Sequence, residues 1–466
     1  MSHSRDQPFN HISDLPNIFT TYRKSVEPLR NCPRESQPRP NQLPPLPPEL
    51  PPQAGPFMIP NTLEDLKSAL LKPFADDSSF GLPEPPSWPA GTLSAHPFTG
   101  GETAAQERLS HLISSGAMTR YKATRNGMLG LDFSTKLSAY LNIGNLTARQ
   151  IHWAMFNFEE GRGEGENAEG YGRAETEGTA AVRFELLWRD YMRLCTRKYG
   201  NKLFDVHGFR SRENEQNPKL PNSTNLPASQ SQNTTSGPSK KHWAYLDQNT
   251  RPIFTRFCAG RTGASLIDAS NRELILTGYT SNRARQNVAS FLSSHLGLDW
   301  RLGAEWYEFL LIDYDVSNNW GNWQYVAGVG NDPRLGRTFN PVKQALDYDP
   351  KGEYVRAWLP ELRGVKLVKD KFNGSKGDKD TKGVSETEEI DENKLLGLYQ
   401  PWSLPEEEKV KLGLKGLDWV DKPLVKIPFS VGGRGRGRGN GEWRGRGRGR
   451  GRFRGRAKGS GRGTAP

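Results

Sequence analysis

The sequence predicts an all-α fold, with one helical domain over residues 98–362, and three observations support this. Apolar and aromatic residues recur at helical spacing in one long stretch, at Phe184, Leu187, Trp188, Tyr191 and Cys195. A second apolar face follows Ser281, at Val288, Phe291, Leu292 and Leu296. Alternation of apolar and polar residues, typical of half-buried strands, is scarce across the domain.

Further elements follow in chain order. A short helix is expected from Ala104 to Ile113, and another is outlined by Trp306, Phe309, Leu310 and Asp313. Two inserts interrupt the helical pattern: residues 159–179 are rich in Gly and Glu, and residues 211–240 in Asn, Ser and Pro. We expect both inserts to be surface loops that do not order.

The flanks differ from the domain in composition. Residues 38–60 contain ten prolines, which favours an extended polyproline spacer, with a Pro-rich ligand for another protein as the alternative. Residues 363–430 combine a charged linker with a short stretch around Trp402 and Trp419 that we expect to dock on the core. Residues 431–466 form an Arg-Gly tail that we expect to be disordered.

Composition limits the function classes. Hydrophobic residues make up 34% of the 466 residues, too few for one core running through the whole chain. The tail holds eleven arginines, one lysine and one glutamate, so it carries +11 of the formal net charge of +12. A basic globular domain is therefore excluded as the source of the charge.

The cysteines and the hydropathy indicate a compartment. Three cysteines are too few for a disulfide framework, and no cluster of Cys and His suggests zinc. No apolar run of membrane-spanning length and no secretory signal are evident. We expect an intracellular protein without membrane contact, in the nucleus or cytoplasm, with an organelle left open.

No Walker A sequence or nucleophile elbow is present, so the chemistry must come from other segments. The hydroxyl groups of Ser134, Thr135 and Ser138 stand just before a helical stretch and suit phosphate oxygens at a helix N-terminus. A plain helix cap is the alternative.

Two further segments carry charge into apolar surroundings. Arg283 and Arg285 open the helix after Ser281 and point to different faces, so one of them can reach an internal partner; a solvated first turn is the alternative. Asp313 and Asp315 lie within an aromatic cluster, and buried carboxylates need cationic partners. Arg285 is the candidate partner, and metal binding by the two carboxylates is the alternative.

Together these segments resemble the flavin-binding domain of the photolyase/cryptochrome family, most closely its cryptochrome DASH branch. The matching stretches include TRNGMLGLDFSTKLSAYL, FELLWRDYMRL, TGYTSNRARQNVASFL and LGLDWRLGAEWYEFLLIDYDVSNNWGNWQY. The usual Thr-Gly-Tyr-Pro of the family is replaced here by Thr262-Gly263-Ala264-Ser265. Residues 1–97 resemble the end of the family's antenna domain followed by the Pro-rich linker. The folate antenna expected in this branch, 5,10-methenyltetrahydrofolate, has no evident place.

The resemblance implies noncovalently bound FAD. The positions that match cofactor contacts are Tyr121, Ser134, Thr135, Lys136, Leu137, Ser138, Arg189, Asn282, Arg285, Asp313, Tyr314, Asp315 and Asn319. It further implies that Arg285 and Asp313 pair beside the flavin ring and that Asn319 faces flavin N5. Trp323, Trp300 and Trp243 match the family's electron relay, although Trp243 aligns only with a small insertion.

The resemblance also implies a DNA site. The matching positions are Glu185, Trp188, Arg283, Gln286, Tyr325 and Gln344. Glu185 would hydrogen-bond the lesion and Trp188 would stack on it, while Tyr325 replaces a second stacking tryptophan. A smaller ring offsets less of the cost of extruding bases from a duplex, which favours single strands.

The sequence thus predicts blue-light-driven electron transfer from reduced FAD to cyclobutane pyrimidine dimers in single-stranded DNA, a deoxyribodipyrimidine photo-lyase activity, by a monomer. A blue-light photoreceptor that signals through partner or nucleic-acid binding is the alternative, and a nucleic-acid-binding protein with a poorly folded flavin domain is a third. The tail is expected to bind nucleic acid, with RNA as good a target as DNA.

Overall fold

The computed structural model describes residues 7–31, 33–35, 41–49, 62–76, 87–210, 243–331, 338–368 and 390–429. The insert at 211–240 and the Arg-Gly tail lie outside these residues, as does most of the Pro-rich segment. The described part is all-α, which confirms the predicted fold class. It contains no named strand, and its isolated β-bridges join Ala244 to Leu298 and Val368 to Ile390.

The helices before the insert at 211–240 are α1 (Phe19–Val26), α2 (Leu63–Asp76), α3 (Glu102–Ser114), α4 (Ala117–Thr124), α5 (Ser138–Ile143), α6 (Ala148–Glu159) and α7 (Glu177–Tyr199). The central helices are α8 (Thr250–Cys258), α9 (Ser265–Thr277), α10 (Asn282–Ser290), α11 (Trp300–Leu310) and α12 (Val316–Ala327). The last helices are α13 (Pro341–Tyr348), α14 (Glu353–Trp358), α15 (Glu392–Tyr399), α16 (Glu406–Lys411) and α17 (Asp418–Asp421).

Short turns complete the fold. The 3-10 turns are η2 (Ile12–Asp14), η3 (Glu27–Leu29), η5 (Gly200–Phe204), η6 (Gly208–Arg210), η8 (Pro360–Leu362) and η9 (Pro401–Ser403), and η7 (Phe291–His295) is a π-helical turn that continues α10. Ser281 caps α10 by accepting from the N–H of Ala284. The helix expected to reach Asp313 ends at Leu310 instead, because the chain turns before α12, and Asp313 lies in that turn.

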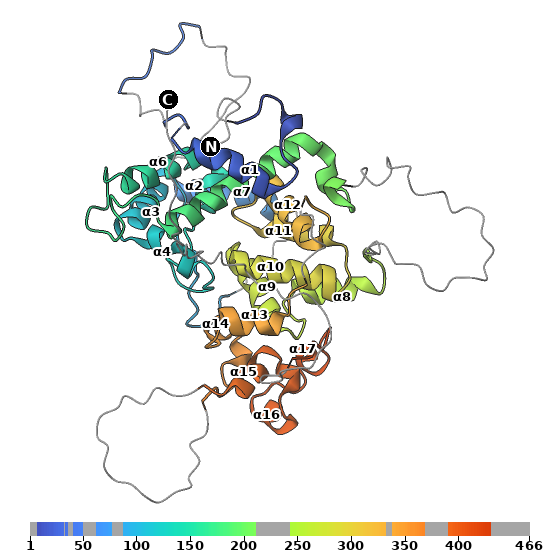
Figure 1. The fold of residues 1–466 in the computed structure, drawn as a ribbon. Coiled ribbons are helices and arrows are strands. Elements are labelled where there is room, and N and C mark those ends of the chain that lie inside the picture. The colour runs from blue at the N-terminus through green and yellow to red at the C-terminus, as the bar shows by residue number, and fades with distance from the viewer. Residues whose placement is uncertain are drawn as a thin grey trace, which may run out of the picture. The chain divides into compact units, whose positions relative to one another are not determined.

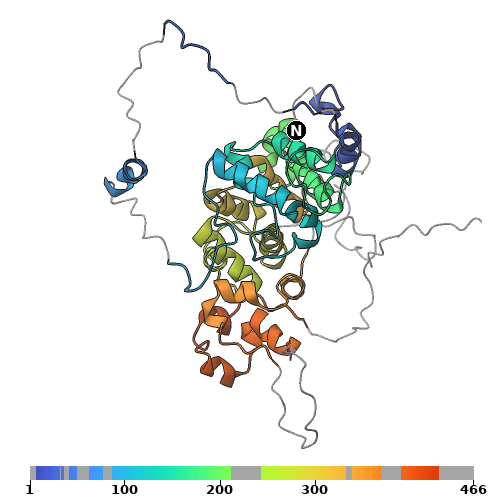
Figure 2. The same cartoon turned by 90° about the vertical axis from the view of Figure 1, so that its left-hand side faces the viewer.

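Three groups of buried side chains form the cores, and α7 joins two of them. Val182 and Leu186 lie in a core with α3, α4 and α6. Tyr191 and Met192, further along α7, lie in a core with α9 to α12. The third core joins α9 to α13, α14, α15 and α17. In Figures 1 and 2, α9 and α10 accordingly lie between the helices α3–α7 and the helices α13–α17.

The insert at 159–179 is folded, so the prediction that it would not order was wrong. Its backbone bonds back to α6, with the N–H of Gly172 donating to the carbonyl oxygen of Phe158 at 3.0 Å. The ring of Tyr171 meets that of Phe158 edge-on at 5.5 Å. The glycines supply left-handed turns, Gly161 and Gly172 among them with φ of 69° and 66°. Their frequency reflects tight turns and not disorder.

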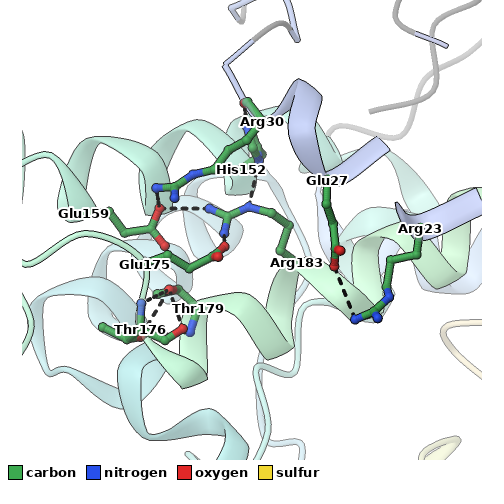
Figure 3. A network of polar contacts seen from close by, with 9 residues as sticks. All are labelled: Arg23, Glu27, Arg30, His152, Glu159, Glu175, Thr176, Thr179 and Arg183. Carbon is green, nitrogen blue, oxygen red and sulfur yellow. Dashed lines mark hydrogen bonds and ion pairs between the residues drawn. The ribbon is translucent and has the colours of Figure 1, made fainter. Parts of the chain in front are cut away.

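Residues 7–31, which precede the Pro-rich segment, pack on α6 and α7. Tyr22 of α1 is 1% exposed and lies in the core that contains α12. At the end of this segment Arg30 forms an ion pair with the buried carboxylate of Glu159, which also takes Arg183 at 3.0 Å (Figure 3). Nε2 of His152 bonds to the carbonyl oxygen of Arg30 at 2.9 Å. Burial, helped by the charge of Arg183, lowers the pKa of His152 to about 4.

None of the described helices is long and apolar enough to span a bilayer.

Candidate functional site

An ion pair between α10 and the turn before α12 lies at the centre of the site. Nη2 of Arg285 donates to Oδ2 of Asp313 at 2.9 Å, and Nε of Arg285 donates to the carbonyl oxygen of Thr280 at 2.9 Å. The Asp313 side chain is 4% exposed. Among the described residues its Oδ1 is buried without a hydrogen-bond partner. Burial works against the charge of Arg285, but Asp313 outweighs it and raises the pKa of the guanidinium.

The hydroxyl-rich segment before α5 is held by Arg108 of α3. The buried guanidinium donates to the carbonyl oxygens of Thr135 at 3.1 Å and Ser134 at 3.3 Å. Ser138 begins α5 and is exposed. Because Arg108 engages carbonyl oxygens, it fixes the loop while leaving the side-chain hydroxyls for other partners.

Lys136, in the middle of this segment, turns inward. Its φ is 59°, in the left-handed region, and its Nζ donates to the hydroxyl of Tyr279 at 2.8 Å. Leu137, which follows, is buried at the N-cap of α5. The ring of His96 lies 5.1 Å from that of Tyr279, and in the described structure both ring nitrogens of His96 are buried without a hydrogen-bond partner.

Three more of the predicted cofactor residues surround this region. Nη2 of Arg189 on α7 donates to the carbonyl oxygen of Leu141 on α5 at 3.2 Å, and burial lowers the pKa of Arg189. Asn282 is the exposed first residue of α10. Burial raises the pKa of Tyr121 on α4, and the guanidinium of Arg125 lies 6.0 Å from its ring.

The start of α12 is fixed by Asp315. Its Oδ1 accepts from the N–H of Asn318 at 2.9 Å, and its Oδ2 accepts from Nε of Arg193 at 2.9 Å. Burial acts to raise the pKa of Asp315, but the hydrogen bonds from Arg193 and Asn318 lower it. Burial and the neighbouring Glu308 raise the pKa of Tyr314 to about 12.

Asn319 and Trp323 lie one helical turn apart on α12. Nδ2 of Asn319 donates to the carbonyl oxygen of Ala304 on α11 at 2.8 Å, so Oδ1 is the remaining acceptor of this amide. Trp323 is 4% exposed, and its ring meets that of Tyr307 at 5.3 Å and 83°.

The other two tryptophans of the predicted relay lie on adjoining segments. Trp300 is fully buried at the start of α11 and meets Trp320 at 5.9 Å and 80°. Nε1 of Trp243 donates to the carbonyl oxygen of Ser293 at 2.9 Å. The next residue, Ala244, pairs with the chain just before α11 through its bridge to Leu298. Trp243 therefore lies near the start of the helix that carries Trp300.

The predicted DNA-contact residues of α7 and α10 form a charged group with the residues that follow α4. Glu185 pairs with Arg125, and burial raises the pKa of Glu185 although Arg125 opposes the shift. Arg283 donates from Nε to Oδ1 of Asn126 at 2.8 Å and from Nη1 to Oε1 of Gln286 at 3.0 Å.

The predicted stacking residues meet each other. The rings of Trp188 and Tyr325 lie 5.2 Å apart at 83°. Gln344 lies on α13, one helical turn before Tyr348. The ring of Tyr348 is 5.2 Å from the guanidinium of Arg283, which brings α13 beside the same group.

Comparison with known proteins identifies the family. Residues 183–414 match the family model described as the FAD binding domain of DNA photolyase. A cryptochrome DASH of Synechocystis is 36% identical over 446 residues, which is 93% of this chain and 70% of that protein. The chain belongs to the cryptochrome DASH family.

Other relatives agree with this assignment. A putative cryptochrome DASH, mitochondrial, of Neurospora crassa is 47% identical over 92% of this chain and 53% of its own length. The crystal structure of the Synechocystis cryptochrome matches with a TM-score of 0.63 at 36% identity, covering 89% of this chain and 67% of that one. The chain spans about half the length of the fungal cryptochrome DASH proteins that it matches.

FAD is the cofactor of this family domain, and the described residues fit it. The open Oδ1 of Asp313 is an acceptor for a ring N–H or a hydroxyl group, and the guanidinium of Arg189 suits a phosphate. The nitrogens of His96 provide further polar atoms without a protein partner. A bound FAD would satisfy buried groups that otherwise cost free energy.

Sequence reasoning missed several supporting residues. Arg125, the C-cap residue of α4, stands four positions after Tyr121, so the spacing could have revealed it. Arg193 likewise stands four positions after Arg189. Arg108 gave no signal, because its partners include backbone carbonyl oxygens that no motif records.

Proposed function

We propose that this chain is a light-driven enzyme that splits cyclobutane pyrimidine dimers in single-stranded DNA with reduced FAD. One observation carries the proposal. Three helices each bear one residue matched to the cofactor and one residue matched to DNA. These are Arg189 and Trp188 on α7, Arg285 and Arg283 on α10, and Asn319 and Tyr325 on α12.

This arrangement supports electron transfer over a short path. At about 100° per residue, neighbours such as Trp188 and Arg189 differ in direction by about 100° and residues two apart by about 160°, so the two sets leave these helices on different faces. Arg125 links the sets, because it pairs with Glu185 of the DNA set and lies 6.0 Å from the ring of Tyr121 of the cofactor set. A dimer held by the DNA set would therefore lie next to the cofactor. When bound, reduced FAD supplies the electron on absorbing blue light.

The chain's own side chains have distinct tasks in this proposal. Trp188 offers an indole for stacking on a base, and Arg283 offers a cation for a phosphate. Glu185, whose pKa is raised by burial, can hold a proton and donate it to a carbonyl oxygen of the dimer. Trp323, Trp300 and Trp243 would pass electrons inward to keep the cofactor reduced.

The decisive experiment is a repair assay on short oligothymidines that carry one dimer. We expect dimer loss under blue light and not in the dark, with single strands repaired faster than duplex. A protein that holds FAD and is photoreduced, yet leaves the dimer intact in both substrates, would refute the proposal. That result would favour the photoreceptor alternative, which shares the flavin and the tryptophans.

The tail adds a second, separate proposal about partners. Its arginines alternate with glycines and are interspersed with Trp443 and Phe453, a composition that suits salt-dependent binding to single-stranded DNA or RNA with little sequence preference.

A further inference from the structure

The indole of Trp188 is held by side chains from two other helices. The ring of Phe19 on α1 meets it at 4.8 Å and 76°, and the ring of Tyr325 on α12 meets it at 5.2 Å and 83°. The indole N–H donates to Oδ1 of Asn322 at 3.0 Å. Both ring contacts have the edge-to-face geometry that aromatic pairs prefer, so the indole is restrained at one tilt.

Phe19 reaches this place because the chain just before it is tied to α7. Nζ of Lys198 donates to the carbonyl oxygen of Leu15 at 2.7 Å. The hydroxyl of Tyr191 donates to the carbonyl oxygen of Pro16 at 3.1 Å. These bonds go to backbone groups, so they fix the path of the chain as it enters α1.

A second anchor lies after α1. The carboxylate of Glu159 is fully buried between Arg30 and Arg183, and His152 bonds to the backbone of Arg30 (Figure 3). Buried charges paired on both sides are costly to separate. The segment is thus held at both ends, and Phe19 lies between the two anchors.

We propose that Phe19 is a positioning residue for nucleic-acid recognition, holding the Trp188 indole at the tilt at which a pyrimidine base stacks on it. The inference rests on the proposed function, in which Trp188 contacts the lesion. It adds that a residue outside the flavin-binding helices sets the geometry of the DNA site.

The physical reason is preorganisation. A side chain that is already ordered loses less conformational freedom when a ligand binds to it. Phe19 also meets Phe184 at 5.0 Å and Tyr191 at 5.4 Å, so it fills the core as well. The change Phe19→Leu keeps most of the apolar burial and removes the ring, which separates positioning from packing.

The test uses the full chain with FAD bound and 5-fluorotryptophan in place of tryptophan. The fluorine resonance of Trp188 is assigned with Trp188→Phe. We expect Phe19→Leu to shift or broaden that resonance and Phe19→Tyr, which keeps the ring, to leave it as in the wild type. Ser25→Ala is the matched control on the same helix, because the Ser25 hydroxyl bonds within α1 to the carbonyl oxygen of Tyr22.

A binding arm connects this position to recognition. Affinity is measured for a single-stranded oligothymidine with one cyclobutane dimer and for the same strand undamaged. Phe19→Leu should weaken dimer binding roughly three- to tenfold, the worth of one aromatic contact, with FAD content unchanged. The undamaged strand should be affected less, and Phe19→Tyr should restore dimer binding.

Every remaining outcome decides against either the inference or the proposed function. An unchanged Trp188 resonance in Phe19→Leu overturns the inference, as does unchanged dimer affinity in a protein whose wild type prefers the dimer. Loss of FAD from both Phe19 variants would assign the residue to packing alone. A wild type that does not prefer the dimer refutes the proposed function, and the fluorine arm then still decides whether Phe19 positions Trp188.

Discussion

Arg285 and Asp313 form the ion pair at the centre of the site, with Nη2 of the arginine 2.9 Å from Oδ2 of the aspartate. The two residues lie on opposite sides of α11 in the sequence, and the aspartate is 4% exposed whereas the arginine is 26% exposed. Only one oxygen of the carboxylate is engaged by a described residue. The pair therefore joins two elements and still offers an acceptor to a ligand.

Asp313→Ala should release FAD or give insoluble protein. The change leaves Arg285 without its partner, and breaking a buried pair costs about 3–5 kcal/mol, with the low end expected because the arginine is partly exposed. Flavin absorbance per protein measures the loss. Asp421→Ala is the control, because Asp421 lies on α17, a helix of the third core, and is not part of this pair. Yellow Asp313→Ala protein with wild-type stability would contradict the assignment.

Glu185→Gln should slow dimer splitting roughly 100-fold, the low end for a general acid, while FAD content stays the same. The amide keeps the size and an acceptor for Arg125 but cannot supply the proton. The rate of splitting at saturating dimer concentration is the measurement. Glu177→Gln on the same helix, whose carboxylate is 83% exposed, should match wild type. Equal rates for both variants would remove Glu185 from the proton-donor role.

Trp323→Phe should retain FAD but photoreduce several-fold more slowly with an external reductant. Phenylalanine fills most of the buried volume beside Tyr307 but is much harder to oxidise than tryptophan. The flavin spectrum followed during blue illumination gives the rate. Trp306→Phe, outside the predicted relay, serves as the control. Photoreduction at the wild-type rate would mean that electrons take another route.

Sequence reasoning succeeded where the pattern is local. The apolar spacing that predicted a helix through Trp188 lies within α7, and Ser281 caps α10 as the sequence indicates. It failed for the glycine-rich insert at 159–179, because glycine is common both in disordered segments and in left-handed turns. It could not foresee Phe19 against Trp188, since a contact between residues so far apart in the chain leaves no periodic signal.

Glu273→Gln should make stability less dependent on pH between about 4.5 and 7. Burial raises the pKa of Glu273 to about 7 from its ordinary value of 4.5, and its Oε2 accepts from Tyr354 at 2.6 Å. Across this window the folded protein holds a proton that the unfolded chain has released. Stability contributed by this group is therefore present below pH 4.5 and is lost as pH rises to 7.

The measurement is the melting temperature of wild type and Glu273→Gln at half-unit steps of pH. The wild type should lose stability relative to the variant as pH rises, by up to about 1.4 kcal/mol per unit. Glu107→Gln, an exposed change of the same charge on α3, controls for net charge. Parallel curves for wild type and Glu273→Gln would show that the group does not titrate in this range.

Deleting residues 431–466 should separate nucleic-acid attraction from dimer recognition. The tail carries +11 of the net charge of +12, so affinity for undamaged single strands should fall steeply, and its salt dependence with it. FAD content and dimer splitting at saturating substrate should persist, because every residue matched to cofactor or lesion lies before residue 363. At low substrate concentration, repair should weaken in low salt and change little in high salt, where attraction by the tail is already screened.

Unchanged binding to single strands would make the tail a solubility device. Loss of FAD would mean that the flavin site depends on the tail, and the boundary near residue 431 would then be wrong.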